Sequence, residues 1–362
     1  MYRTEQLGRV GQSVWLDNIT RDMLTNGTLE RYIAELSVTG LTSNPSIYDK
    51  AIGGSAAYDE VISRLSASGS DGESIFFELA LDDLRRAADM FLPIHRRTNG
   101  VDGFVSLEVS PLLANETAAT TAAARRLHAM GGRPNLFIKI PGTPAGLAAI
   151  EETIFAGVPV NVTLLFSTEQ YLAAANAYTR GIERRVDAGL DPYVASVASV
   201  FVSRWDGPLA GELPADLRLK LGIATGHRTF AAYRTLLESD RWQRLLNEGA
   251  RPQRLLWAST GTKDKTASDV LYIEALAAPL TVNTMPEETL HAFADHGTVG
   301  RLLAAGPDPA NDALIARLEA AGVDIDGLAL RLQEQGVASF ATAWQSLLSR
   351  IHEKAAAIAA AS

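Results

Sequence analysis

The feature that most constrains the fold of this chain is the alternation of short apolar runs with longer amphipathic segments from end to end. Strands are predicted at residues 14–16, 40–42, 104–107, 136–138, 160–164, 197–202, 255–258 and 280–282. Between or after them, helical patterns cover residues 73–91, 116–130, 168–187, 220–237 and 286–295. Such alternation is typical of a parallel sheet covered by helices, so the sequence predicts an α/β fold.

Polar side chains at the ends of the predicted strands distinguish between two α/β architectures. An open nucleotide-binding sheet places its chemistry at one glycine-rich turn, whereas a (β/α)8 barrel distributes it over many strand ends. The sequence contains no G-x-G-x-x-G and no G-x-x-x-x-G-K-[ST] motif. Polar residues instead lie in or after nearly every predicted strand: Asp17, Asn44, Glu108, Lys139, Asn161, Thr163, Ser199, Arg204, Ser259 and Lys263. We therefore expect a (β/α)8 TIM barrel.

The C-terminal part of the chain is predicted to add helices to this barrel. We expect one barrel domain over residues 1–362, of which about 301–362 is helical decoration. Apolar residues recur every three or four positions in 328–361, at Val337, Phe340, Trp344, Leu347 and Ile351. This spacing predicts a helix with one buried face. Packing on the outside of the barrel is the preferred interpretation, and a lid or a dimer contact is the alternative.

Composition excludes several classes of function. The net charge of −9 and the pI near 5.3 argue against a surface that binds nucleic acid or an anionic membrane. The chain has no cysteine, so it has no thiolate nucleophile and no cysteine-based metal site, and no metal or organic cofactor is expected. No apolar run is long enough to span a bilayer, and the N-terminal residues lack the apolar core of a signal peptide. We expect a cytoplasmic protein.

Lys139 is the most unusual residue, because it lies within the apolar run 135–141 that otherwise resembles a buried strand. Lysine is scarce, since only six of the 33 Lys and Arg residues are lysine. A primary amine can form a Schiff base with a ketone, which a guanidinium cannot. A free lysine is neutral to only about 0.05% at pH 7, but burial can lower its pKa by up to about 3–5 units. A structural ion pair fits this segment equally well.

Schiff-base chemistry also requires groups that move protons. Glu108 and Asp17 each follow an apolar strand and are the candidate acid/base carboxylates, although a helix cap is the commoner role for an acid at a strand end. Asn161 and Thr163 share one face of their strand, and the other face carries Val160, Val162 and Leu164. This polar face, together with Asn44 after the second strand, predicts a site for a polar ligand.

Two later strands end in residues suited to a phosphate group. Ser199 and Arg204 belong to one, and Ser259 and Lys263 follow the other. Hydroxyls and cations after late strands match the position at which barrels commonly bind phosphate. For Lys263 alone, a surface salt bridge is an equally good explanation.

Five motifs together give a resemblance to a known family. They are residues 15–17 (WLD), 42–46 (TSNPS), 137–141 (FIKIP), 161–167 (NVTLLFS) and 281–286 (TVNTMP). With them the chain resembles the transaldolases, which are Schiff-base enzymes of the pentose phosphate pathway, and it is similar to their bacterial form from about Val14 to His296. The resemblance implies transfer of dihydroxyacetone from sedoheptulose 7-phosphate or fructose 6-phosphate to glyceraldehyde 3-phosphate or erythrose 4-phosphate. It also suggests a homodimer.

The resemblance further implies a role for each candidate residue. Lys139 would form the Schiff base, Glu108 and Asp17 would move protons, and Thr163 would hold a catalytic water. The dihydroxyacetone unit would be bound by Asn44, Asn161 and Ser199, and the distal phosphate by Arg204 and Ser259. Many relatives carry arginine two residues after this serine, where the chain has Gly261, so Lys263 is the candidate for a second phosphate cation.

Two alternative functions use the same residues differently. An aldolase of the fructose-6-phosphate type would use the same lysine but release free dihydroxyacetone. A sugar-phosphate-binding protein without catalysis is disfavoured, because the lysine and both carboxylates are present.

Overall fold

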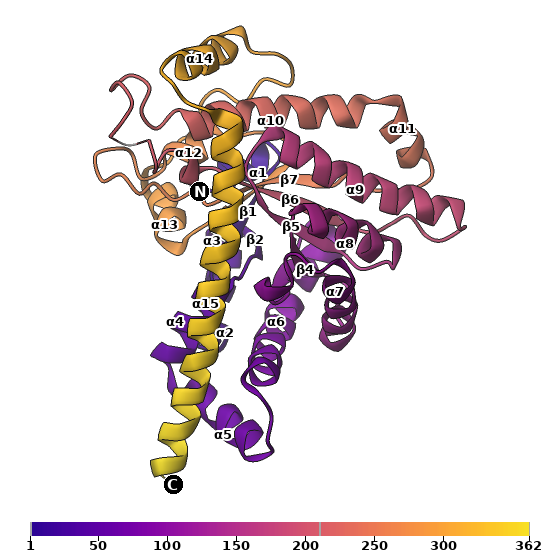
Figure 1. The fold of residues 1–362 in the computed structure, drawn as a ribbon, viewed down its shortest axis with the longest axis vertical. Helices are drawn as coiled ribbons and strands as arrows, with labels where there is room; N and C mark the ends of the chain where they lie inside the picture. The colour runs from indigo at the N-terminus through magenta and orange to yellow at the C-terminus, as the bar shows by residue number, and fades with distance from the viewer. Residues whose placement is uncertain (1, 210, 362) are drawn as a thin grey trace.

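The chain forms a closed barrel of eight parallel strands in the order β1 to β8, as a computed structural model of residues 2–209 and 211–361 shows (Figure 1). The strands are β1 Gln12–Leu16, β2 Val38–Leu41, β3 Val105–Glu108, β4 Leu136–Pro141, β5 Val160–Leu165, β6 Ser196–Phe201, β7 Arg254–Ala258 and β8 Thr281–Met285. The barrel closes where β1 pairs with β8, with Gln12 opposite Thr281 and Leu16 opposite Met285. The predicted (β/α)8 barrel is confirmed. Its extent as one domain over 1–362 stays a prediction, and positions 1, 210 and 362 lie outside the described residues.

Helices and short 3-10 turns connect the strands and continue beyond β8. The helices are α1 Glu5–Arg9, α2 Arg21–Thr25, α3 Thr28–Glu35, α4 Pro45–Gly54, α5 Asp59–Ala67, α6 Gly72–Arg97, α7 Thr117–Gly131, α8 Pro144–Phe155, α9 Thr168–Asp187, α10 Leu221–Glu238, α11 Asp240–Asn247, α12 Leu271–Ala275, α13 Glu287–His296, α14 Pro309–Ala320 and α15 Ile325–Ala361. The 3-10 turns are η1 Ala56–Tyr58, η2 Pro111–Leu113 and η3 Ser203–Trp205. Ser167 and Gln170 form a capping box at the start of α9: the Ser167 hydroxyl accepts from the Gln170 backbone N–H, and the Gln170 side chain accepts from the Ser167 backbone N–H.

Aromatic side chains fill the amino-terminal half of the barrel interior. Phe104 and Phe137 stack with their ring centroids 4.1 Å apart, and Trp15 lies 6.2 Å from Phe137. The Trp15 indole Nε1 donates to Asp102 Oδ1 at 2.7 Å. A Cβ at Gly40 would lie 2.6 Å from the Phe104 carbonyl oxygen, so only glycine fits this point of β2. Because rings occupy this half, space for a ligand remains at the carboxyl ends of the strands.

The C-terminal helix α15 packs in two ways along its length. Figure 1 shows it running from beside the barrel to a position alongside α4 and α5, with which it is in contact. In its second half, the Trp344 ring lies 5.0 Å from Phe76 and 5.6 Å from Phe77 of α6. In its first half, Gln333 Nε2 donates to carbonyls at the ends of β4 and β5. Exterior packing is therefore correct for the second half, and wrong for the first half, which covers part of the barrel mouth.

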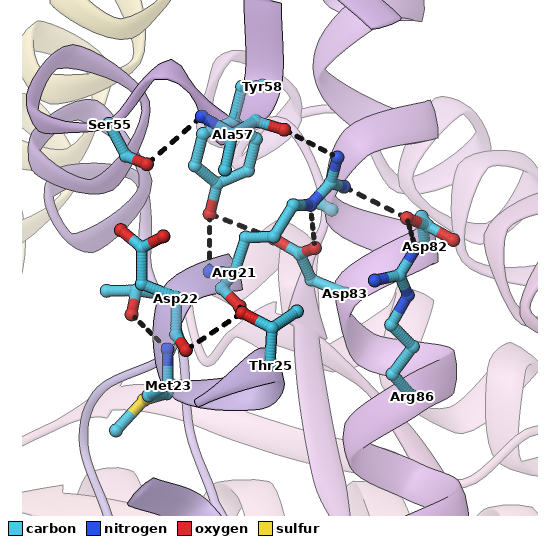
Figure 2. A network of polar contacts seen from close by, with 12 residues as sticks. Arg21, Asp22, Met23, Thr25, Ser55, Ala57, Tyr58, Asp82, Asp83 and Arg86 are labelled. Carbon is cyan, nitrogen blue, oxygen red and sulfur yellow. Dashed lines mark hydrogen bonds and ion pairs between the residues drawn. The ribbon is translucent and has the colours of Figure 1, made fainter. Parts of the chain in front are cut away.

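A buried ionic network holds α2 against α6 (Figure 2). The Arg21 Nε donates to Asp83 Oδ1 at 2.8 Å, and its Nη2 donates to Asp82 Oδ2 at 3.0 Å. The Tyr58 hydroxyl donates to Asp83 Oδ2 at 3.0 Å. Arg86 pairs with Asp82 on the exposed side of the same network at 2.9 Å. These contacts fix α2, and with it the loop that leads from β1 and Asp17.

Candidate active site

The carboxyl ends of the strands surround a cavity of about 280 Å³. Its wall includes every residue predicted for the site except Glu108 and Asn161, which lie directly behind it: Asp17, Asn44, Lys139, Thr163, Ser199, Arg204, Ser259 and Lys263. Residues from β1, β4, β5 and β6 meet here although they are far apart in the sequence. The structure therefore brings the predicted catalytic and binding residues into one site.

Register within the barrel explains why Lys139 has its neighbours. In the parallel ladders Glu108 pairs with Lys139, and Lys139 pairs with Asn161, so these three residues occupy one level of the barrel. Lys139 Nζ lies 3.5 Å from Glu108 Oε2 and donates to the Ser43 carbonyl oxygen at 3.3 Å. Lys139 is 5% exposed and Glu108 is 4% exposed. The amine thus faces the cavity from a nearly water-free position.

Burial changes the acidity of Glu108. Desolvation raises its pKa to about 7, the positive charge of Lys139 opposes this rise, and the charge of Asp17 adds to it. Both carboxyl oxygens are buried and have no hydrogen-bond partner among the described residues. A carboxyl group with this pKa exists in both protonation states near neutral pH, so it can act as acid and as base.

Asp17 sits at the end of β1 within a chain of hydroxyl groups. Thr42 Oγ1 donates to Asp17 Oδ1 at 2.7 Å, and it lies 2.7 Å from Thr284 Oγ1. Thr42 and Thr284 also line the cavity. They orient the Asp17 carboxylate toward the same space as the Lys139 amine.

The predicted polar face of β5 takes part in a hydrogen-bond chain across three strands. Asn161 Nδ2 donates to Ser106 Oγ at 3.1 Å, and Ser199 Oγ donates to Asn161 Oδ1 at 2.7 Å. Thr163 Oγ1 is buried without a hydrogen-bond partner among the residues that the structure describes. Asn44 caps α4, because its Oδ1 accepts from the Ile47 backbone at 3.1 Å. That leaves its amide nitrogen for the cavity.

One residue of β5 does not follow the predicted alternation. The prediction places Leu164 on the same face of β5 as Val160 and Val162, and this is wrong. Leu164 has φ 58° where the pairing of β5 with β6 shifts register between Val162 and Leu165. Its side chain belongs to the apolar cluster that includes Phe340 of α15, while Val160 and Val162 face the surrounding helices. The left-handed backbone turns Leu164 toward the C-terminal helix.

The opposite end of the cavity carries two cations. Arg204 lies over the Phe201 ring at 5.6 Å, burial lowers its pKa, and its Nε is buried without a hydrogen-bond partner in the described part of the chain. Ser259 Oγ lies 3.0 Å from Ser203 Oγ. Partial desolvation and the charge of Arg204 lower the pKa of Lys263. Lys263 and Arg204 both line the cavity, and the role of Lys263 as a second phosphate cation stays a prediction.

Sequence reasoning missed two neighbours of the Lys139 amine. One is the Ser43 backbone carbonyl, which no side-chain pattern reveals. The other is Phe340, whose ring centroid lies 5.7 Å from Lys139 Nζ. Its spacing in the C-terminal helix indicated only that it is buried. Neither residue could be assigned to the site without knowing where α15 crosses the barrel.

Within residues 2–209 and 211–361, no group of three or more His, Asp or Glu side chains is arranged to hold a metal ion. Among the helices in the described ranges, none has both the length and the apolar character required to cross a membrane.

Comparison with known proteins identifies the family. Residues 14–351 match the family described as Transaldolase/Fructose-6-phosphate aldolase. The chain is 42% identical over 359 residues to a transaldolase from Renibacterium salmoninarum, covering 97% of this chain and 96% of that one. It is 43% identical to transaldolases from Thiobacillus denitrificans, over 96% of this chain and 99% of that one, and from Thermobifida fusca, over 98% of each. The chain therefore belongs to the transaldolase/fructose-6-phosphate aldolase family and is an enzyme of the transaldolase type.

Proposed function

We propose that the enzyme transfers a dihydroxyacetone unit between sugar phosphates through a Schiff base on Lys139. The donor is a ketose phosphate, sedoheptulose 7-phosphate or fructose 6-phosphate, and the acceptor is an aldose phosphate, glyceraldehyde 3-phosphate or erythrose 4-phosphate. We assign this reaction to the pentose phosphate pathway in the cytoplasm. The observation that carries the proposal is the buried Lys139 amine beside a carboxyl group, Glu108, whose pKa is raised to about 7.

The first step is attack of the neutral Lys139 amine on the ketone carbon of the donor. The resulting carbinolamine loses its hydroxyl group as water and becomes an iminium. Glu108, 3.5 Å from the amine nitrogen, gives and takes the protons of this step. The buried hydroxyl of Thr163 faces the cavity and would hold the water that Glu108 uses.

The second step is cleavage of the bond between carbons 3 and 4 of the sugar. Asp17 takes the proton of the carbon 4 hydroxyl, the aldose phosphate leaves, and the electron pair remains on the enzyme as an enamine. In the transfer step the enamine carbon attacks the acceptor aldehyde, and Asp17 returns a proton to the new hydroxyl group. Addition of water to the iminium then releases the product and regenerates the Lys139 amine.

Binding groups at both ends of the cavity suit such a substrate. Asn44 and Ser199 line the cavity and provide amide and hydroxyl groups for the hydroxyls of dihydroxyacetone, and Asn161, behind the wall, accepts a hydrogen bond from Ser199 and would hold it in position. At the other end, Arg204 and Lys263 provide positive charge for the phosphate. This arrangement supports a phosphorylated polyol in preference to a neutral sugar.

The aldolase alternative differs in the fate of the enamine. It releases free dihydroxyacetone, whereas a transferase retains the unit until an acceptor arrives. The relatives, which align with this chain over nearly their whole length, are named transaldolase, and this favours transfer.

The test is reductive trapping of the Schiff base. Treatment with borohydride and fructose 6-phosphate should attach the three-carbon unit to Lys139, as peptide mass spectrometry would detect. Lys139→Arg should abolish the adduct and the activity, because guanidinium is not a nucleophile at neutral pH. Lys220→Arg, at an exposed lysine before α10, is the matched control and should leave both unchanged. An adduct that persists in Lys139→Arg would refute the mechanism.

A further inference from the structure

An aromatic ring from the far end of the chain covers one side of the Lys139 amine. Phe340 of α15 is buried, lines the cavity, and lies with its ring centroid 5.7 Å from Lys139 Nζ. It belongs to the apolar cluster that also contains Leu164, Phe166 and Leu332. This contact brings a ring to within about 6 Å of an amine, the range of a cation–π interaction.

Contacts on both sides of Phe340 fix this part of α15 to the barrel. Before it, Gln333 Nε2 donates to the Gly142 carbonyl at 3.1 Å and to the Leu164 carbonyl at 2.9 Å. A Cβ at Gly336 would lie 2.8 Å from Leu164 Cδ2, so the helix approaches β5 closely. After it, Arg350 Nε donates to Asp49 Oδ1 of α4 at 2.7 Å. These contacts hold Phe340 in the cavity wall.

The position of the ring matters for the enamine of the proposed function, on which this inference rests. In that intermediate the reactive carbon is two bonds away from the Lys139 nitrogen, so the three-carbon unit lies in the space that Phe340 borders. Two fates compete there. In transfer, the enamine carbon forms a bond to the acceptor aldehyde carbon, and the aldehyde oxygen takes a proton.

In release, the enamine carbon instead takes a proton from solvent. Water then adds to the iminium carbon, the carbon–nitrogen bond breaks, the nitrogen leaves as the Lys139 ammonium, and free dihydroxyacetone results. We propose that Phe340 shields the enamine carbon from bulk water, and that it thereby determines how much of the bound unit is transferred and how much is released.

The experiment measures the partition between the two products. Enzyme with fructose 6-phosphate and erythrose 4-phosphate forms sedoheptulose 7-phosphate by transfer, measured by chromatography, and dihydroxyacetone by release, measured with glycerol dehydrogenase. In Phe340→Ala the ratio of release to transfer should rise by about tenfold, which corresponds to about 1.4 kcal/mol of relative barrier. Phe340→Leu, which restores most of the apolar volume, should return the ratio close to that of the wild type.

Val337→Ala is the matched control, because Val337 lies one turn earlier in α15, packs on the same apolar cluster and does not line the cavity. A general loosening of α15 would change the ratio in this variant too, and that result would overturn the proposal. An unchanged ratio in Phe340→Ala would also overturn it. Borohydride trapping on Lys139 is measured in every variant. Absence of an adduct in the wild type refutes the proposed function itself, whereas an adduct with an unchanged ratio in Phe340→Ala refutes only the role of Phe340.

Discussion

Replacement of Arg21 by methionine should reveal how strongly the buried ionic network between α2 and α6 stabilises the fold. The side chain of Arg21 is 7% exposed and that of Asp83 is 0% exposed, with Nε and Oδ1 2.8 Å apart. Without the guanidinium, the Asp83 carboxylate keeps only its hydrogen bond from Tyr58 and becomes an uncompensated buried charge. Loss of one partner from a buried pair costs about 3–5 kcal/mol, and we expect a loss of that size in the free energy of unfolding.

The protonation of Asp83 gives this loss a pH dependence. Desolvation raises the pKa of Asp83, and the Arg21 charge opposes that rise. Without Arg21 the pKa of Asp83 rises further. The folded variant then keeps the proton of Asp83 at pH values at which the unfolded chain has already released it. Since stability falls with rising pH wherever the folded state binds more protons, the loss should be large at pH 7 and smaller in mild acid.

Urea unfolding followed by circular dichroism at both pH values measures these quantities. Arg86→Met is the matched control, because its pair with Asp82 is exposed, with side chains 48% and 39% accessible. An exposed pair contributes about 0–1 kcal/mol. The double variant Arg21→Met/Asp83→Asn should regain stability, because an amide carries no charge. The reasoning is refuted if Arg21→Met loses no more stability than Arg86→Met, or if its loss is the same in mild acid.

Three further changes test other parts of the structure. Glu108→Gln should gain stability relative to the wild type as pH rises from 4.5 to about 7, because over this range the unfolded wild-type chain releases the Glu108 proton while the folded state keeps it, as urea titrations would show. Lys263→Ala should raise KM for the phosphorylated acceptor by about tenfold, the effect of one charge-assisted hydrogen bond of about 1.5 kcal/mol, while Lys265→Ala leaves it unchanged in steady-state assays. Gly40→Ala should lower Tm sharply in calorimetry, because its Cβ would lie 2.6 Å from the Phe104 carbonyl oxygen.

The sequence could predict the barrel and most of the cavity wall because both depend on local patterns. Apolar runs locate the strands, and in a parallel barrel every strand end faces the same side, so Asp17, Lys139 and Arg204 had to converge. The pairing of Glu108 with Lys139 needed the register, which the sequence does not contain.

Features that depend on long-range packing could not be predicted. The spacing in α15 indicated a buried face, but it could not show that Trp344 packs on α6 while Phe340 faces Lys139. The left-handed backbone conformation of Leu164 could not be predicted either, because a leucine at φ 58° is unfavourable unless surrounding contacts hold it there. Gly336 allows α15 to approach Leu164 closely, since a Cβ there would lie 2.8 Å from Leu164 Cδ2.

The polar atoms without hydrogen-bond partners explain why the site should respond strongly to its ligand. Around the cavity, in the part of the chain that the structure describes, these atoms are Glu108 Oε1 and Oε2, Thr163 Oγ1, Arg204 Nε and Thr262 Oγ1. A sugar phosphate with hydroxyl and phosphate oxygens can satisfy several of these groups at once. Because a ligand that binds only the folded state stabilises it, Tm should rise with fructose 6-phosphate concentration, and the rise should be smaller for unphosphorylated fructose, which cannot satisfy Arg204.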